Sequence, residues 1–290
     1  MAPNKGMIAG SYFMQIAFRN SDGLPMGSES APDAVASGVT SHAYKVKGYI
    51  SVEAPAITRS FATRKAGQKI LGTKQLGLAS IAPFNIVLSD LDELFFAYIS
   101  GGVVDSTTAS GNTIIASNVN KVVKPQFVAI FTMGFQNDEG TDEYLNYFYP
   151  NVTFGDAIPG GNDGDGDNPN AQTYSCAPTQ SPNTGFGFTF AETALAVVDN
   201  SDLFVCVRAP KPLGLTTYVD DGAATSFVTG YLPTSSVVDG STNMIAIDGV
   251  DGNAQIAALS VTTGATTHTA QTEDDIWNLA YYTDFEPIPA

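Results

Sequence analysis

Short runs of apolar, β-branched and aromatic residues, separated by turn residues, recur along most of the chain. Runs of this kind, bounded by Gly, Pro, Asn and Asp, are typical of β-strands. We expect strands at 11–19, 44–52 continuing into 56–63, 84–88, 113–116, 126–135, 144–154, 171–176, 186–190 and 203–207. From about residue 194 the runs become short, acidic and rich in Thr, with frequent turn signals. The pattern predicts a mainly β protein.

One stretch departs from this pattern and predicts a helix over residues 90–100. Its apolar residues recur at helical spacing after Ser89, which we take as the N-cap, and Gly101-Gly102 ends it. The face that we expect to pack on a sheet consists of Leu91, Leu94, Phe95 and Tyr98. Replacement of a buried Leu94 by Ala would then cost about 2–5 kcal/mol.

Two stretches carry no apolar period. Residues 64–80 hold four basic residues and three glycines, which predicts a flexible basic loop. Residues 159–170, PGGNDGDGDNPN, have no means of building a core, so we expect an exposed loop. We divide the chain into a β domain over 1–193 and, over 194–290, a C-terminal β extension or small β domain.

The net charge of −16 is unevenly distributed along the chain. Residues 1–124 hold eleven Lys and Arg against eight acids, a net charge of +3. Residues 125–290 hold two against twenty-one, a net charge of −19. A polarised monomer surface and an oligomer whose opposite patches guide head-to-tail stacking both account for this division.

Candidate catalytic and nucleotide-binding chemistry is sparse. His42 and His268 have no metal-ligand spacing, and no GxSxG nucleophile motif occurs. Residues 67–74, GQKILGTK, carry Thr before Lys, the reverse of the order that a phosphate loop needs. We therefore expect no enzyme and no cofactor.

An acidic loop offers the nearest approach to a metal site. Asp163, Asp165 and Asp167 occupy positions 1, 3 and 5 of a calcium loop. Asn168 then stands where Gly is required, and Tyr174 stands where a bidentate acid is required. A solvated loop is favoured over weak incidental calcium binding.

The two cysteines and the lack of long apolar runs bear on the class of protein. Cys176 and Cys206 are too few for a disulfide framework, which leaves one bridge or two buried thiols as alternatives. No apolar run approaches the length that crosses a bilayer, and Met1–Gly10 lacks an export-signal pattern. We expect no membrane span.

The features over 48–102 follow a recognisable order: a long strand (YISVEAPAITRSFATR), a basic glycine-containing stretch (KAGQKILGTKQLGLAS), a strand (PFNIVLS), a helix (DLDELFFAYIS) and a Gly-Gly stop. This order resembles that of tail tube proteins of siphophages. The later run PGGNDGDGDNPNAQTYSCAP is similar to the end of that domain. The resemblance covers roughly residues 1–190.

The resemblance implies a tail-tube-type β-sandwich or barrel with one flanking helix. Subunits of that family form stacked hexameric rings, and a long loop reaches the adjacent ring. Residues 59–80 would be this arm, and the basic residues expected to make its contacts are Arg59, Arg64, Lys65, Lys69 and Lys74. The implied partners are further copies of the chain and other tail proteins at the two ends, in a virion tail assembled in the host cytoplasm.

DNA would pass through such a tube without specific binding, since a pI near 4.2 argues against phosphate neutralisation as the main role. Three other classes stay open: a capsid decoration or fibre protein, a cell-surface adhesin or pilus-like subunit, and a carbohydrate-active enzyme. An enzyme of that kind needs paired carboxylates in a cleft.

Overall fold

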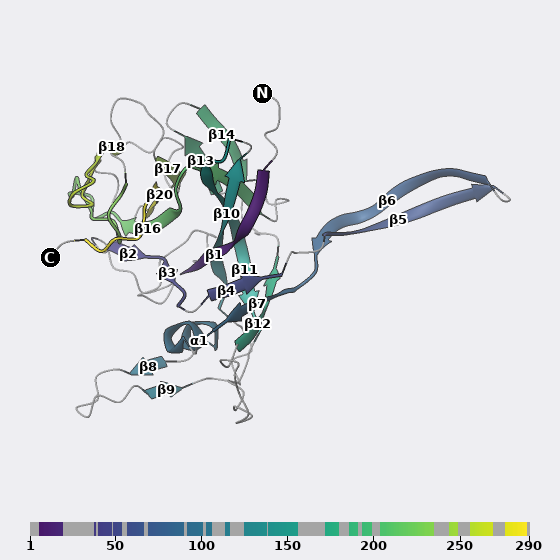
Figure 1. The fold of residues 1–290 in the computed structure, drawn as a ribbon, viewed down its shortest axis with the longest axis horizontal. Helices are drawn as coiled ribbons and strands as arrows, with labels where there is room; N and C mark the ends of the chain where they lie inside the picture. The colour runs from purple at the N-terminus through teal and green to yellow at the C-terminus, as the bar shows by residue number, and fades with distance from the viewer. Residues whose placement is uncertain are drawn as a thin grey trace.

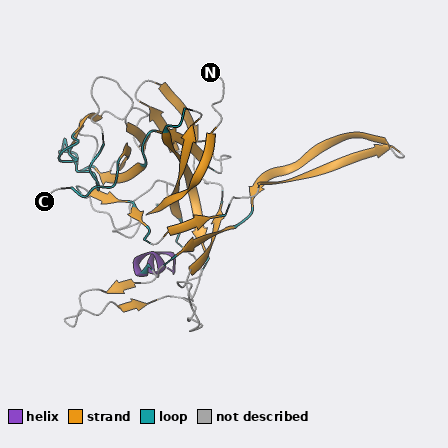
Figure 2. Cartoon of the chain, in the orientation of Figure 1, coloured by secondary structure: helices purple, strands orange, loops and turns teal. Residues whose placement is uncertain are grey.

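The computed structural model consists of antiparallel sheets with one short helix among the described residues (Figure 2). The expectation of a mainly β fold is confirmed. The structure describes residues 6–19, 38, 40–47, 49–53, 57–66, 69–89, 92–100, 103–105, 114–116, 125–137, 139–155, 172–179, 186–190, 193–198, 204–234, 244–248, 256–268 and 276–288.

The larger sheet runs in the order β3-β1-β10-β11-β12-β7-β4 (Figure 1). A further strand, β15, pairs with β11 at the end remote from β12. Its strands are β1 Gly6–Phe18, β3 Tyr44–Lys45, β4 Tyr49–Val52, β7 Phe84–Leu88, β10 Phe127–Asn137, β11 Asp142–Phe154, β12 Gln172–Pro178 and β15 Val205–Ala209. The end strand β4 also lies against β1, so the sheet curls around on itself.

The alternation of side chains along β1 shows how this sheet separates two cores. Met14 and Ile16 belong to the cluster inside the curl. Ala17 belongs to a second cluster on the opposite face, and the amide of Gln15 on that face donates a hydrogen bond to the Leu213 carbonyl at 2.6 Å. Successive strand residues point to opposite faces, so one strand serves both cores.

The smaller sheet runs in the order β14-β13-β17-β20-β16-β2. Its strands are β2 Thr40–His42, β13 Phe186–Phe190, β14 Thr193–Val198, β16 Leu213–Val219, β17 Met244–Asp248 and β20 Ile276–Tyr282. Leu213, Leu215 and Ala280 pack in the cluster shared with the larger sheet. Leu279 and Tyr281 belong to a third cluster. This sheet is therefore buried on two faces.

Both sheets draw strands from both sides of residue 193, where the sequence suggested a boundary. Strand β2 pairs with β16, and β15 pairs with β11. Strand β14, Thr193–Val198, itself crosses this position and pairs with β13. The two stretches 1–193 and 194–290 are thus joined through both sheets. The expected loop at 159–170 lies outside the described residues.

The remaining described strands form three two-stranded pairs. They are β5 Ile57–Ala66 with β6 Lys69–Ile81, β8 Val103–Asp105 with β9 Ile114–Ala116, and β18 Ile256–Leu259 with β19 Thr266–His268. The expectation of a loop at 64–80 is wrong, because this stretch pairs as a β-hairpin. The stretch 44–63, which the sequence predicts as one long bent strand or as two strands in series, is divided into β3, β4 and β5.

The helix of the described part of the chain, α1 Glu93–Ser100, begins later than expected. Its N-cap is Asp92 and not Ser89, since the Asp92 carboxylate accepts a hydrogen bond from the Phe95 amide at 3.1 Å. The same carboxylate, 4% exposed, accepts hydrogen bonds from the Tyr44 hydroxyl at 2.7 Å and the Lys47 amide at 2.7 Å. Burial and the hydrogen bond to Asp92 raise the pKa of Tyr44. Asp92 therefore ties the helix to the chain that follows β3.

The apolar face of α1 is centred differently from the expected one. Phe95 is fully buried, and its ring packs edge-on against Phe154 and Tyr174, with centroids 5.3 and 5.2 Å away. Tyr98 is half-buried against the same core, while Leu94 is half-buried and outside it. Leu91 lies outside the described residues. The helix fills the curl of the larger sheet through Phe95 and Ile99, both of which are buried in its core cluster.

This packing gives a prediction for two adjacent positions. Phe95→Ala should destabilise the fold by about 3–5 kcal/mol, because it leaves a cavity among the rings. Leu94→Ala should cost clearly less. Urea unfolding of both variants measures the difference, and equal losses would contradict the burial pattern of α1.

The assignment of Asp92 as the N-cap of α1 gives a second prediction. Asp92→Ala should cost about 2 kcal/mol or more, because it removes the helix cap and leaves the Lys47 amide without its acceptor. Ser89→Ala, at the position that the sequence favoured, is the matched control and should cost less. Thermal unfolding followed by circular dichroism compares them; a larger loss at Ser89 would show that the cap is assigned to the wrong residue.

Candidate assembly surface

The β5–β6 hairpin is the most prominent surface feature of the chain, and we call it the arm. Figure 1 shows it projecting as a long ribbon away from the two sheets. Its strands pair antiparallel from Ile57↔Ile81 to Ala66↔Lys69, with irregularities in register at two places. The expected basic loop is therefore an extended element with a defined register.

The arm continues outward from a strand pair of the larger sheet. Strand β4 leads into it, β7 follows it, and these two strands pair with each other. At its root the Glu53 amide donates to the Asn85 carbonyl at 2.9 Å, and the Asn85 amide donates to the Glu53 carboxylate at 3.1 Å. Ile86 and Leu88 of β7 are fully buried in the curl. The arm is thus anchored in the main core at its base.

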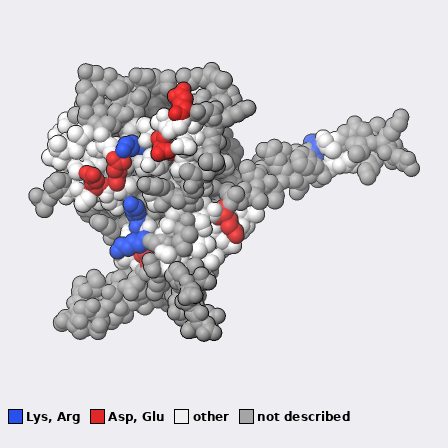
Figure 3. All heavy atoms as spheres, in the orientation of Figure 1, with Lys and Arg blue, Asp and Glu red and all other residues white. Residues whose placement is uncertain are grey.

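All charged residues of the arm are basic. Residues 57–81 contain five basic residues and no acid. The Arg64 and Lys74 side chains are exposed, and no acid among the described residues pairs with either. Arg59, Lys65 and Lys69 occupy strand positions in the same hairpin. In Figure 3 basic atoms stand on the arm with no acidic atoms near them in this view.

A two-stranded ribbon has little means of stabilising itself. Isolated hairpins are marginal in water because neither face is buried and both outer edges leave backbone groups unpaired. Among the described residues β5 and β6 pair only with each other. The geometry favours a partner surface that covers the arm.

The acidic half of the chain offers the complementary charge. Its two basic residues are already paired within the same half: Arg208 with Glu143, and Lys211 with Asp284 at 2.9 Å. The remaining nineteen acids of residues 125–290 have no basic residue left in that stretch. Their counter-charges must come from the first 124 residues, from another molecule or from solvent ions.

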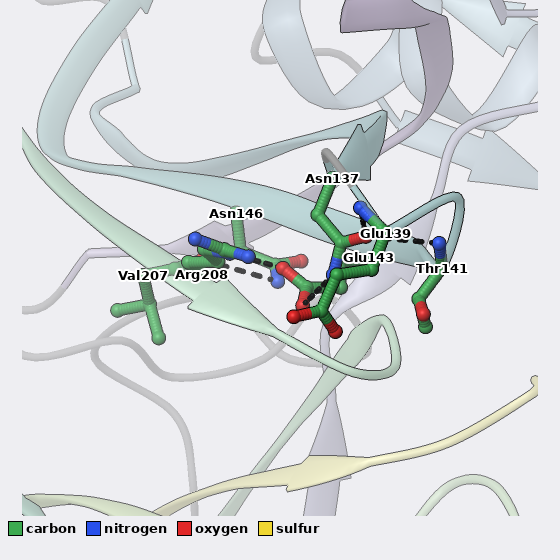
Figure 4. Close-up of polar contacts among 7 residues, drawn as sticks. All are labelled: Asn137, Glu139, Thr141, Glu143, Asn146, Val207 and Arg208. Atoms are coloured by element: carbon green, nitrogen blue, oxygen red, sulfur yellow. Dashed lines mark hydrogen bonds and ion pairs between the residues drawn. The ribbon is translucent and has the colours of Figure 1, made fainter. Parts of the chain in front are cut away.

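The Arg208 pair lies beside the β10–β11 turn, shown in Figure 4. The Arg208 guanidinium also lies 5.0 Å from the centroid of the Phe135 ring. Its hydrogen bond holds the pKa of Glu143 below the ordinary value. The pair therefore stabilises the fold at pH values above the ordinary carboxyl pKa. This stabilisation is lost as the pH falls through the lowered pKa of Glu143.

The turn itself presents further acids in a fixed shape. The Asn137 side-chain oxygen accepts hydrogen bonds from the Glu139 and Thr141 amides at 3.0 and 2.9 Å (Figure 4). Gly140 adopts a positive φ of 77°, which closes the turn. Glu139 and Asp142 are exposed. An ordered acidic edge thus flanks the larger sheet.

The other candidate chemistry finds little geometric support. Among the described residues no group of three His, Cys, Asp or Glu side chains could hold a metal. The calcium candidates Asp163, Asp165 and Asp167 lie outside those residues. His42 contacts Thr216, its Nδ1 lying 3.2 Å from the hydroxyl oxygen.

The cysteines are not bridged. Cys176 is buried and Cys206 is exposed, so the alternatives of a disulfide and of two buried thiols are both wrong. Burial raises the pKa of the Cys176 thiol. Among the contacts of the described residues, no histidine lies beside either thiol to activate it as a nucleophile.

One hollow of about 290 Å³ lies beside the C-terminal segment. Two acids, Asp284 and Glu286, line it with Lys211. The Lys211 ammonium donates hydrogen bonds to both oxygens of Asp284 at 2.9 Å. A sugar-cleaving enzyme needs two carboxyl groups directed at its substrate, and Asp284 is already held by Lys211. The hollow gives the enzyme alternative no specific support.

No protein-family model matches the sequence, and no curated protein matches it either. Within the part of the chain that the structure describes, no helix is long and apolar enough to cross a membrane. The arm, its charge and the acidic half are therefore the features from which a function can be proposed.

Proposed function

We propose that the chain is a non-enzymatic structural subunit that assembles with copies of itself into stacked rings, forming the tail tube of a long-tailed phage. The observation that carries the proposal is the arm: a projecting hairpin with five bases, no acid and no covering surface among the described residues. A second support is the order of strand, basic stretch, strand and helix that resembles siphophage tail tube proteins.

The physical role of the arm follows from its charge and reach. A ring built from this chain presents arms on one side and acidic surface from residues 125–290 for them to meet. Each exposed ion pair contributes only about 0–1 kcal/mol, so the stack depends on many such contacts repeated around a ring. Salt should weaken them, because exposed charges are screened over about 8–10 Å at physiological ionic strength.

The acidic excess also suits a conduit for DNA. Negative charge along a channel repels phosphates, so DNA passes without adhering to the wall. The closest competing function is a capsid decoration or fibre protein or a cell-surface adhesin, each of which needs a β scaffold but no stack of rings. Assembly into a hollow tube separates these classes.

Negative-stain microscopy of the purified protein tests the proposal. We expect rings or hollow tubes at low to moderate salt, with fewer and shorter tubes as salt rises. A protein that stays monomeric up to millimolar concentration at every salt tested would contradict it.

A variant of the arm tests the role of its bases. Replacing Arg64, Lys65, Lys69 and Lys74 with Ser should abolish or shorten tubes and leave the subunit folded, because the substitutions fall in the arm, where Arg64 and Lys74 are exposed, and not in the strands of the two sheets. The matched control replaces four bases elsewhere in the first half, Lys5, Lys47, Lys121 and Lys124, with Ser. Equal loss of tubes in both variants would show that net charge matters and the arm does not.

A further inference from the structure

The register of the arm divides its exposed residues between two faces. Opposed pairs are Ala62↔Lys74, Thr63↔Thr73 and Arg64↔Gly72. Residues directly opposite in an antiparallel pair share a face, and successive residues alternate. Arg64 and Lys74 therefore lie on one face, and Thr63 and Thr73 lie on the other.

The basic face is shaped so that its charges are accessible. Lys74 lies opposite Ala62, and Arg64 lies opposite Gly72, so neither cation has a bulky or acidic cross-strand neighbour. The two cations occupy diagonal positions, roughly 7–8 Å apart in such pairs. Ala62, Arg64 and Lys74 are all exposed. This arrangement places two repelling charges together, and an acidic partner surface would relieve the repulsion.

The opposite face has a different chemistry. Thr63 and Thr73 are exposed, uncharged and directly paired across the strands. Cross-strand Thr pairs suit a ribbon face that is open to solvent. The arm thus has a charged face and a neutral face at the same level along its length.

We propose that the arm docks through the Arg64–Lys74 face onto acidic surface of a second copy of the chain, with the Thr63–Thr73 face turned away from it. The partner is a second copy because residues 125–290 carry a net charge of −19 and keep both of their bases in internal pairs. The inference rests on the proposed function and adds to it the orientation of the arm.

A face-exchange variant tests this orientation without changing composition or net charge. It combines Thr63→Arg, Arg64→Thr, Thr73→Lys and Lys74→Thr, all at exposed strand positions. We expect the concentration needed for tube formation to rise about tenfold or more, as several lost contacts per subunit would require. Circular dichroism and size-exclusion chromatography check that the variant is folded.

Two controls keep the charges on their original face. Thr63→Ser with Thr73→Ser should assemble as the parent does. Arg64→Lys should also assemble nearly as the parent, because screened surface contacts depend on charge more than on bidentate geometry.

The outcomes separate the orientation from the proposed function. If the parent forms tubes and the face-exchange variant forms them equally well, the orientation is wrong and the tube function stands. If the parent never assembles, both are wrong. If the exchange leaves assembly unchanged but abolishes salt-dependent binding of a duplex oligonucleotide, the basic face serves nucleic acid instead.

Discussion

The apolar interior of the curled larger sheet is the constraint on which the rest of the structure depends. Phe95 enters this interior from α1 and packs against Phe154 and Tyr174 on two different strands. The same interior buries Ile86 and Leu88 of β7. Since β7 pairs with β4, and the arm joins these two strands, burial in the core fixes where the arm leaves the body.

The arm, in contrast to its root, is not held by burial in the core. Thr63 on one face and Arg64 on the other are exposed, the arm has no acid of its own, and no third strand pairs with it among the described residues. Its charge and its unpaired edges gain stability only from a surface outside the hairpin. A root anchored in the core, beneath a basic ribbon that no described strand covers, is the physical basis for the proposal that the chain is a subunit of an assembly.

Sequence predicted several strands at or near their bounds, gave no bounds for the buried strands β16 and β20, and missed the arm. Strand β7 was placed correctly because its residues belong to the core, and β13 was placed correctly at the same bounds. The sequence predicts a loop at 64–80 because this stretch has no hydrophobic alternation. The pair Gly67-Gln68 between its two halves, a composition that two-residue hairpin loops favour, was the available signal.

Contacts between distant segments were beyond prediction from one sequence. Ser89 and Asp92 are equally plausible caps by residue type, and the Tyr44 hydroxyl and Lys47 amide give Asp92 partners across the fold. The pairing of β2 with β16, and of Arg208 with Glu143, likewise joins segments far apart in the chain. At the candidate site, the basic residues could be predicted from the sequence, but the hairpin register that places Arg64 and Lys74 on one face could not.

The most direct test of the central claim is a cryo-electron microscopy map of the assembled protein at side-chain resolution. The account predicts that each arm crosses to a neighbouring ring, with Arg64 and Lys74 within about 4 Å of carboxylates from residues 125–290 of another copy, the distance of an ion pair. An arm folded back on its own subunit, or free of contact with any other copy, would contradict it.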